Sequence, residues 1–128
     1  MKLTLIRGLP GAGKSTMAKA MVEVDSSLRH FEADQYFVDA SGNYRFEPSE
    51  IEDAHTWCLT ETRNALENGS SVVVSNTFTR KWEMAPYRKL AKELGAELEI
   101  LEATGNYGSI HGVPQKTIDA MRSRWEVL

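Results

Sequence analysis

The sequence predicts an α/β fold, a three-layer α/β/α sandwich around a small parallel sheet of about four strands. Apolar stretches of strand length alternate along the chain with stretches whose apolar residues recur at helical spacing. A glycine-rich loop at residues 8–15 joins the first strand to the first helix. Strands that alternate with helices are expected to pair in parallel, with helices on both faces. The 128 residues are expected to form one domain, residues 1–128.

The loop Gly8-Leu9-Pro10-Gly11-Ala12-Gly13-Lys14-Ser15 matches G-x-x-x-x-G-K-[ST], the phosphate-binding P-loop, in the strand–loop–helix setting that the pattern requires. Glycines let several backbone N–H groups converge on phosphates, and the helix N-terminus that follows also favours an anion. This loop and Thr16 are therefore predicted to bind ATP. Lys14 is expected to reach the β- and γ-phosphates, and the Ser15 hydroxyl to ligate Mg²⁺. The fold class is thus that of the P-loop NTPases.

Apolar patterns predict the elements in the first part of the chain. Lys2–Arg7 has apolar residues at Leu3, Leu5 and Ile6, which is typical of a central strand. In Lys14–Val24, Met17 and Met21 lie four residues apart with alanines beside them, which predicts a helix with one apolar face. Residues 28–33 are predicted to form a second strand.

A long helix and a third strand are predicted next. Pro48 is placed to open the helix, because proline is favoured in the first turn, and Asn68-Gly69 is a typical helix end. Cys58 lies on the apolar face of this helix and is expected to be a small core residue. Residues 70–75 include three consecutive valines, which suit a strand that is covered on both faces.

The last part of the chain is predicted to add two helices and a fourth strand. Lys81–Leu94 carries an apolar set that includes Trp82, and Glu97–Glu102 alternates polar and apolar residues like a strand. Residues 104–112 are polar and glycine-rich, and are expected to form a mobile loop. Pro114 then starts the last helix, whose apolar residues are Ile118, Met121 and Trp125.

Asp34 directly follows the second predicted strand. Ligands of open parallel sheets bind beyond the carboxyl ends of the strands, so this carboxylate is expected to face the same crevice as the P-loop. The alternative role is that of a helix cap or turn residue, which is the commoner one for an aspartate. Its position alone leaves both roles open.

Composition narrows the class of protein. The formal net charge of −3 argues against a chain wrapped in nucleic acid, while it leaves room for a local basic groove. Cys58 is the single cysteine, so the chain has no disulfide partner for it, and a reducing compartment is expected. No apolar run approaches the ~18 residues of a membrane span, so no membrane partner and a cytoplasmic location are expected. The three histidines stand apart from other metal ligands, so no zinc site is predicted.

Several further motifs indicate a family. The most specific are W-E-M-A-P-Y at residues 82–87 and I-H-G-V at residues 110–113. The other matching stretches are R-G-L-P-G-A-G-K-S-T (7–16), D-Q-Y-F (34–37), G-N-Y-R-F (42–46), E-D-A-H-T-W (52–57) and N-T (76–77). With these motifs the chain resembles the small P-loop kinases related to the 5′-hydroxyl kinase domain of bacteriophage polynucleotide kinase, and in particular their NEDD4-binding-protein-2-like branch.

The resemblance implies an ATP-dependent kinase that transfers the γ-phosphoryl group to a hydroxyl acceptor. In such kinases an aspartate at the position of Asp34 accepts the proton of the attacking hydroxyl. Lys14, Mg²⁺ held through Ser15, and arginines from a lid share the neutralisation of charge. Asp34, Lys14 and Arg80 are the catalytic residues expected here, with Arg80 supplying a cation just beyond the third strand. The acceptor is expected to be a nucleic-acid end with a 5′-hydroxyl, a nucleotide or a small metabolite.

The end of the third strand departs from the family pattern. Relatives carry an aspartate there, whereas this chain has Ser75-Asn76, which brings no negative charge to the metal. Asn76 is then a candidate to orient a water molecule, and Asp34 a candidate to help hold Mg²⁺ through solvent.

The lid departs as well. Relatives place arginines just before I-H-G-V, whereas this chain has Tyr107-Gly108-Ser109, and its nearest arginines are Arg122 and Arg124. A missing arginine can slow phosphoryl transfer by several orders of magnitude. The alternative function is therefore a nucleotide-binding module with weak or no kinase activity. A third interpretation is an NTPase whose acceptor is water.

A basic cluster bears on the acceptor. It fits either a strip that tracks the phosphates of a nucleic acid or the solvated face of an amphipathic helix, and the second is the better supported. Its residues are Arg80, Lys81, Arg88, Lys89 and Lys92.

Overall fold

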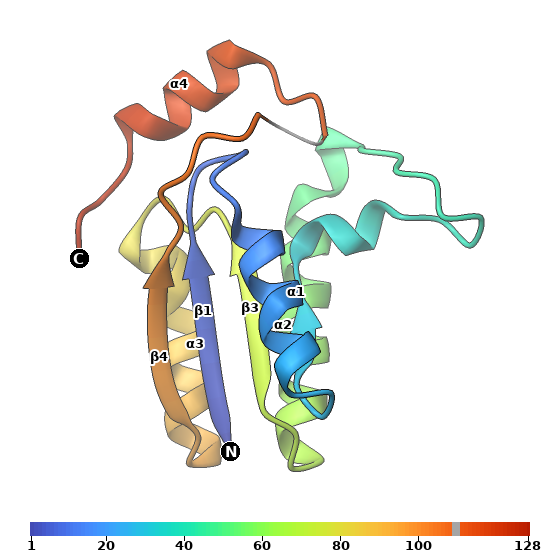
Figure 1. Ribbon diagram of the computed structural model, residues 1–128, viewed down its shortest axis with the longest axis vertical. Coiled ribbons are helices and arrows are strands. Elements are labelled where there is room, and N and C mark those ends of the chain that lie inside the picture. The colour runs from blue at the N-terminus through green and yellow to red at the C-terminus, as the bar shows by residue number, and fades with distance from the viewer. Residues whose placement is uncertain (109–110) are drawn as a thin grey trace.

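Four parallel strands form the central sheet in the order β2-β3-β1-β4 (Figure 1). The computed structural model describes residues 1–108 and 111–128. The P-loop strand lies inside the sheet, between β3 and β4, as expected for this fold class. The strands are β1 (Lys2–Arg7), β2 (Arg29–Phe31), β3 (Val72–Asn76) and β4 (Glu97–Glu102).

Helices cover both faces of the sheet, which confirms the predicted three-layer α/β/α sandwich. Helices α2 and α3 lie on one face and α1 on the other (Figure 1). Helix α4 lies on neither face, because it crosses above the carboxyl ends of the strands. The helices are α1 (Lys14–Val24), α2 (Ile51–Glu67), α3 (Lys81–Leu94) and α4 (Gln115–Ser123).

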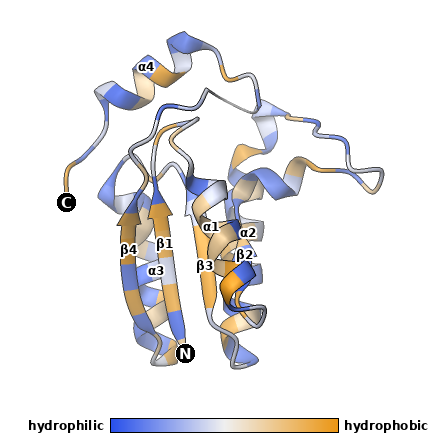
Figure 2. Ribbon diagram, in the orientation of Figure 1, coloured by the Kyte–Doolittle hydropathy of each residue, from blue (hydrophilic) through white to orange (hydrophobic). Residues whose placement is uncertain are grey.

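The alternation of side chains along the strands divides the core into two clusters. Leu3 and Leu5 of β1 point to the face covered by α2 and α3, and Ile6 points to the face covered by α1. All three side chains are fully buried. Figure 2 shows the apolar residues concentrated on the strands and on the helix faces turned towards them. The burial of these side chains stabilises the sheet and thereby keeps the carboxyl ends of its strands in register.

Three predictions about local structure were wrong. The second strand is only Arg29–Phe31, because a 3-10 helix begins at Ala33 and runs to Phe37. Trp82 is 67% exposed and is no part of the core. Trp125 lies beyond the end of α4, where it contacts a buried arginine. The loop predicted over residues 104–112 falls partly outside the described residues.

The buried arginine is Arg7, the last residue of β1, whose side chain has no exposed surface. Its Nε and Nη2 atoms donate to the carbonyl oxygen of Phe78 at 3.1 and 2.8 Å, and Nη2 also donates to that of Thr79 at 3.2 Å. Phe78 has a φ of 46°, which is unfavourable for an aromatic residue. The guanidinium group therefore holds the chain after β3 in a strained conformation.

The segment after α4 packs onto the same loop. The Trp125 ring lies 3.9 Å from the guanidinium carbon of Arg7. The backbone N–H of Glu126 donates to the Thr79 carbonyl at 2.7 Å, and its carboxylate accepts from the backbone N–H of Lys81 at 2.9 Å. Arg7 thus joins the end of β1, the loop after β3 and the C-terminal segment, and this junction anchors one end of α4.

Arg7→Ala should lower the free energy of unfolding by about 3 kcal/mol, because it leaves buried carbonyl groups unpaired and creates a cavity under Trp125. Urea denaturation followed by circular dichroism measures this loss. The matched control is Arg63→Ala, since Arg63 forms exposed ion pairs with Glu67 and Glu93. That control should cost less than about 1 kcal/mol. Equal losses in the two variants would contradict the assigned role of Arg7.

Candidate functional site

The P-loop connects β1 to α1 and depends on glycine at two positions. Gly11 and Gly13 have φ values of 82° and 97°, a backbone conformation that other residues rarely adopt. A Cβ atom at Gly11 would also lie 2.8 Å from the backbone of Gly108. The loop after β4 therefore packs directly against the P-loop, and Tyr107 donates its backbone N–H to the Gly11 carbonyl at 2.8 Å.

Lys14 is partly buried at the start of α1. Its Nζ donates to the Leu9 carbonyl at 3.1 Å, so the side chain folds back over the loop. Burial lowers the pKa of Lys14, while the charges of Glu32 and Asp34 oppose this shift. The P-loop lysine thus has two carboxylates in its surroundings, one of which was the predicted Asp34.

The other carboxylate, Glu32, was missed by the sequence analysis. Its Oε2 accepts hydrogen bonds from Ser15 Oγ at 2.7 Å and Ser75 Oγ at 2.8 Å. His30 Nε2 lies 2.7 Å from Ser75 Oγ and 3.6 Å from the same carboxylate oxygen. Burial alone would raise the pKa of Glu32, but its interactions with His30, Ser15 and Ser75 outweigh burial and bring the pKa to about 2. Glu32 is therefore a fixed negative charge beside Ser15.

Strand register explains why these side chains meet. β2 pairs with β3 so that Phe31 lies opposite Val74, and one residue further Glu32 lies beside Ser75. Successive side chains of a strand point to opposite faces, so Glu32 and Ser75 both face α1. Ser15 is in the first turn of α1 and points back towards them. The alternation His30–Glu32 was the signal in the sequence, although a three-residue strand makes it weak.

Asn76 points to the opposite face. It is buried, its Oδ1 accepts from the backbone N–H of Ala33 at 2.8 Å, and its Nδ2 lies 3.8 Å from Cys58 Sγ. These contacts tie the end of β2 to β3. These contacts do not support its suggested role in orienting a water molecule, because both ends of the amide contact other residues of the core. Cys58 is buried as expected, and burial raises the pKa of its thiol.

Asp34 lies in the 3-10 helix after β2, beneath two stacked rings. Tyr44 donates its hydroxyl to Asp34 Oδ1 at 3.1 Å, and His111 Nε2 lies 3.6 Å from Oδ2. The Tyr44 and His111 rings are 4.1 Å apart and 18° from parallel. Burial and the charge of Asp34 both raise the pKa of Tyr44, so its hydroxyl keeps its proton. Both oxygens of the carboxylate are therefore oriented, and one edge of it remains open, since the side chain is 49% exposed.

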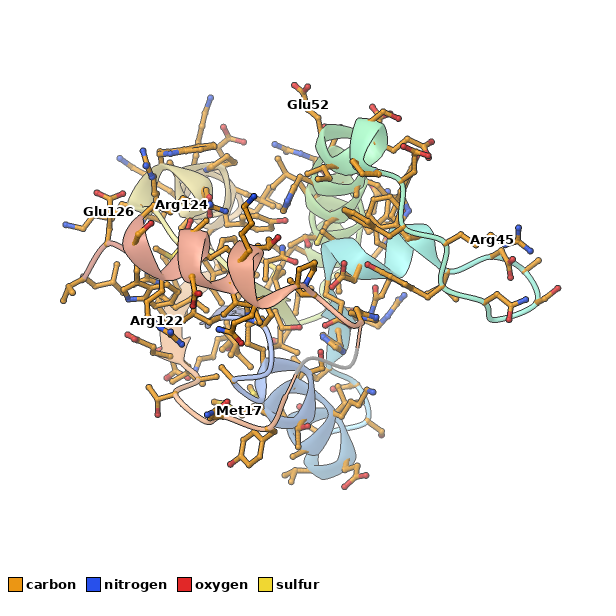
Figure 3. The ribbon with its side chains drawn as sticks, turned by 90° about the horizontal axis from the view of Figure 1, so that it is seen from above. Met17, Arg45, Glu52, Arg122, Arg124 and Glu126 are labelled. Carbon is orange, nitrogen blue, oxygen red and sulfur yellow. The ribbon has the colours of Figure 1, made fainter. Side chains whose placement is uncertain are left out.

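The arginines lie further out. Arg80 is exposed at the start of α3, and in the described part of the chain no hydrogen bond or ion pair links it to Lys14 or Asp34. Arg124 donates from Nε to Thr79 Oγ1 at 3.3 Å, whereas Arg122 lines a cleft under α4. Figure 3 shows Arg122 and Arg124 on opposite sides of α4, and Arg45 at the outer end of the segment after the 3-10 helix.

Two cavities border the P-loop. One of about 350 Å³ lies between the start of α1 and the loop after β4, and its lining includes Thr16, Met17, Thr104 and Gly105. The other, about 850 Å³, lies between the P-loop and α4, and Leu9, Ile118, Arg122 and Trp125 line part of it. Their sizes fall in the range of small-molecule sites.

The described residues contain no cluster of three or more His, Cys, Asp or Glu side chains that could hold a metal ion. Mg²⁺ bound with a nucleotide needs few protein ligands, because phosphate oxygens and water supply the others. The pair of Ser15 and Glu32 fits such an ion, since both offer hard oxygen atoms at one point. No helix in residues 1–108 and 111–128 is long and apolar enough to cross a membrane.

The fold defines the class of protein: a P-loop domain with a kinase-like fold. Among solved structures, the chain is similar to the Pnkp1/Rnl/Hen1 RNA repair complex (TM-score 0.74, 17% identity, 96% of this chain and 43% of that chain). It is also similar to a gluconokinase from Sinorhizobium meliloti 1021 (0.59, 16%, 98% and 75%). A third similar structure is the APS kinase CysC of Mycobacterium tuberculosis (0.60, 14%, 93% and 66%). At these identities the likeness establishes the fold.

The family follows from sequence. A family model described as "AAA domain" matches residues 3–106, and the chain belongs to this family of P-loop kinase-like domains. NEDD4-binding protein 2 of Homo sapiens is 36% identical over 92 residues, which are 71% of this chain and 5% of that protein. The predicted resemblance is thereby confirmed, while the chain spans only a small part of that relative.

Asn76→Asp should lower the free energy of unfolding by about 2–4 kcal/mol, because it places an unpaired charge on the apolar face next to Cys58. Thermal and urea denaturation measure the loss. Asn64→Asp, an exposed change on α2, is the matched control and should stay within about 0.5 kcal/mol of wild type. If Asn76→Asp were as mild as the control, Asn76 would face the P-loop rather than the core.

Proposed function

We propose that the chain is an ATP-dependent phosphotransferase that moves the γ-phosphoryl group to a hydroxyl acceptor. The observation that carries the proposal is the convergence of Lys14, Ser15 and two carboxylates, Glu32 and Asp34, at the carboxyl end of the sheet. A site that bound only metal-free phosphate would be weakened by carboxylates, which repel it. A site that transfers phosphate needs a metal and a proton acceptor, and carboxylates serve both.

The P-loop side of the site would bind the triphosphate. Backbone N–H groups of residues 8–16 and the N-terminus of α1 favour the anion, and Lys14 adds a mobile positive charge. Ser15 and Glu32 would hold Mg²⁺, which neutralises charge on the phosphates. The cavity of about 350 Å³ beside Thr16 and Met17 has room for the nucleoside end of ATP.

Asp34 would act as the general base. It accepts the proton as the acceptor oxygen bonds to the γ-phosphorus and the bond to the β–γ bridging oxygen breaks, which leaves ADP. The Tyr44 hydroxyl and the stacked His111 orient its two oxygens and leave its exposed edge for the acceptor. Arg80 is the candidate cation for the transferred group, with Arg122 as a second candidate on the α4 side.

A specific observation favours a second candidate, a nucleotide-binding module with weak or no kinase activity. Among the described residues, no hydrogen bond or ion pair joins Arg80, Arg122 or Arg124 to Lys14 or Asp34. An arginine that reaches the transferred phosphoryl group is worth about 10³–10⁵ in rate. Without such an arginine, ATP binding would persist while turnover fell. Water as the sole acceptor is a further form of this low-turnover function.

Asp34→Asn should reduce transfer of label from γ-labelled ATP by about 10²–10⁴, because the amide cannot accept the proton. Its affinity for ATP should stay within about threefold of wild type, since Asp34 faces the acceptor side. Asp53→Asn, an exposed change in the first turn of α2, is the matched control and should leave transfer unchanged. Unchanged transfer in Asp34→Asn would exclude this residue as the base.

Lys14→Ala should weaken ATP binding about 10- to 100-fold, which is the loss of a charge-assisted hydrogen bond. Thermal stabilisation by MgATP measures it, with Lys92→Ala on α3 as the control. An affinity equal to that of wild type would mean that ATP does not occupy the P-loop.

The acceptor is identified by offering a 5′-hydroxyl oligonucleotide and, separately, a pool of nucleosides and sugars. Label on the oligonucleotide alone supports a polynucleotide kinase, and label in the pool alone supports a metabolite kinase. Stabilisation by MgATP with no labelled product supports the binding module, and release of free phosphate without any acceptor supports an NTPase.

A further inference from the structure

We infer that Glu32, directly after the second strand, supplies the carboxylate that fixes the Mg²⁺ of bound ATP, in place of an acid on the third strand. P-loop NTPases hold this ion with the P-loop Ser or Thr and an aspartate of the Walker B strand. Here β3, next to the P-loop strand, ends in Ser75-Asn76. The inference deepens the proposed function and rests on it.

The contact between Ser15 and Glu32 has the polarity that a metal site requires. Ser15 Oγ donates its proton to Glu32 Oε2 at 2.7 Å, which leaves the lone pairs of the hydroxyl oxygen free for a cation. The carboxylate is an acceptor only and has a second oxygen beyond this bond. A hydrated Mg²⁺ at Ser15 would therefore have carboxylate oxygens beside its water molecules.

The third strand cannot take this role with its own side chains. Asn76 is turned to the α2 face and is committed to Ala33 and Cys58. Ser75 faces the P-loop, but it carries a hydroxyl and donates it to Glu32 at 2.8 Å. Ser75 thus positions the carboxylate at the place in the sheet where an acid on β3 would have stood.

The contacts of Glu32 fix its negative charge close to the P-loop, so this charge affects the free energy of bound ATP. Its side chain is 17% exposed, and both serine hydroxyls, together with His30, contact one of its oxygens. A fixed negative charge beside a triphosphate raises the free energy of bound ATP unless a cation lies between them. Glu32 should therefore weaken the binding of metal-free ATP and strengthen that of MgATP.

These opposite effects define the test. Affinity for a fluorescent ATP analogue is measured in EDTA and in saturating Mg²⁺, and the ratio of the two affinities is the Mg²⁺ gain. Wild type is expected to show a gain of about tenfold or more, within the usual range of coupling between two ligands. Glu32→Gln keeps the shape of the side chain and removes its charge. It should lose most of the gain while it binds metal-free ATP as tightly as wild type or more tightly.

The matched control is Glu99→Gln, because Glu99 lies on β4 and pairs with Lys2 at 3.1 Å, away from Ser15. It should keep the full Mg²⁺ gain. A merely structural role of Glu32 would lower both affinities of Glu32→Gln together, and that result would overturn the inference. Thermal denaturation of each variant confirms that it is folded at the temperature of the measurement.

A charge relocation makes the test sharper. The double variant Glu32→Ser with Ser75→Asp moves the acid from the residue after β2 to its hydrogen-bond partner on β3, and keeps one hydroxyl and one carboxylate beside Ser15. It should recover a Mg²⁺ gain that Glu32→Ser alone lacks. Absence of recovery in a folded double variant would count against the inference, as would a full gain in Glu32→Gln.

The result is separable from that of the proposed function. The Mg²⁺ gain is a binding measurement and requires no turnover, whereas the proposed function is decided by transfer of label. A protein with the expected gain and no labelled product would retain the role of Glu32 and lose the kinase. A protein that transfers label with no dependence of the gain on Glu32 would retain the kinase and lose this role.

Discussion

The parallel pairing of β3 with β1 on one side and β2 on the other decides which side chains meet at the P-loop. Because side chains alternate along a strand, Ser75 and Glu32 face α1, and Asn76 faces α2. A shift of β2 by one residue would exchange the two faces and remove Glu32 from Ser15. The Asn76 side chain accepts a hydrogen bond from the backbone of Ala33 and so opposes that shift. A core residue thereby determines which side chains meet on the opposite face of the sheet.

A buried charge, Arg7, and a partly buried one, Glu32, lie at the same end of the sheet and are stabilised in different ways. Arg7 is surrounded by carbonyl oxygens and an indole ring, and it fastens the loop after β3 to the C-terminal segment. Glu32 is surrounded by hydroxyl groups and His30. The Arg7 side chain is fully buried, although its Nη1 atom has no hydrogen-bond partner among the described residues. The Glu32 side chain is 17% exposed, and within the described part of the chain its hydrogen bonds all reach Oε2, which suits a group that also has to meet a ligand.

The sequence predicts most of the fold, because its signals are local: valine runs, helical periods, and the glycines of the P-loop. It also predicts that Asp34 lies near Lys14, since the ends of parallel strands share one edge. It does not reveal Glu32, whose strand is too short for its alternation to be read, nor the stacking of Trp125 on Arg7. Both depend on contacts between segments far apart in the chain. Ser75 in the sequence indicates that the third strand lacks an acid, and only the pairing of the strands shows that Glu32 lies beside it.

The two carboxylates are held by different groups of residues, so the proposed function lets binding and transfer vary independently in one site. Glu32 contacts the P-loop serine, while Asp34 contacts Tyr44 and His111, which come from two other segments. In the proposed function, changes on the Glu32 side are expected to alter the binding of the metal and the nucleotide, and changes on the Asp34 side the binding of the acceptor. The candidate cations, Arg80 and Arg122, belong to neither group. Arg122 on α4 lines the cleft that adjoins the P-loop, while Trp125 and Arg124 anchor the C-terminal end of this helix. The proposed function therefore makes transfer depend on the position of α4, and nucleotide binding on the P-loop and Glu32.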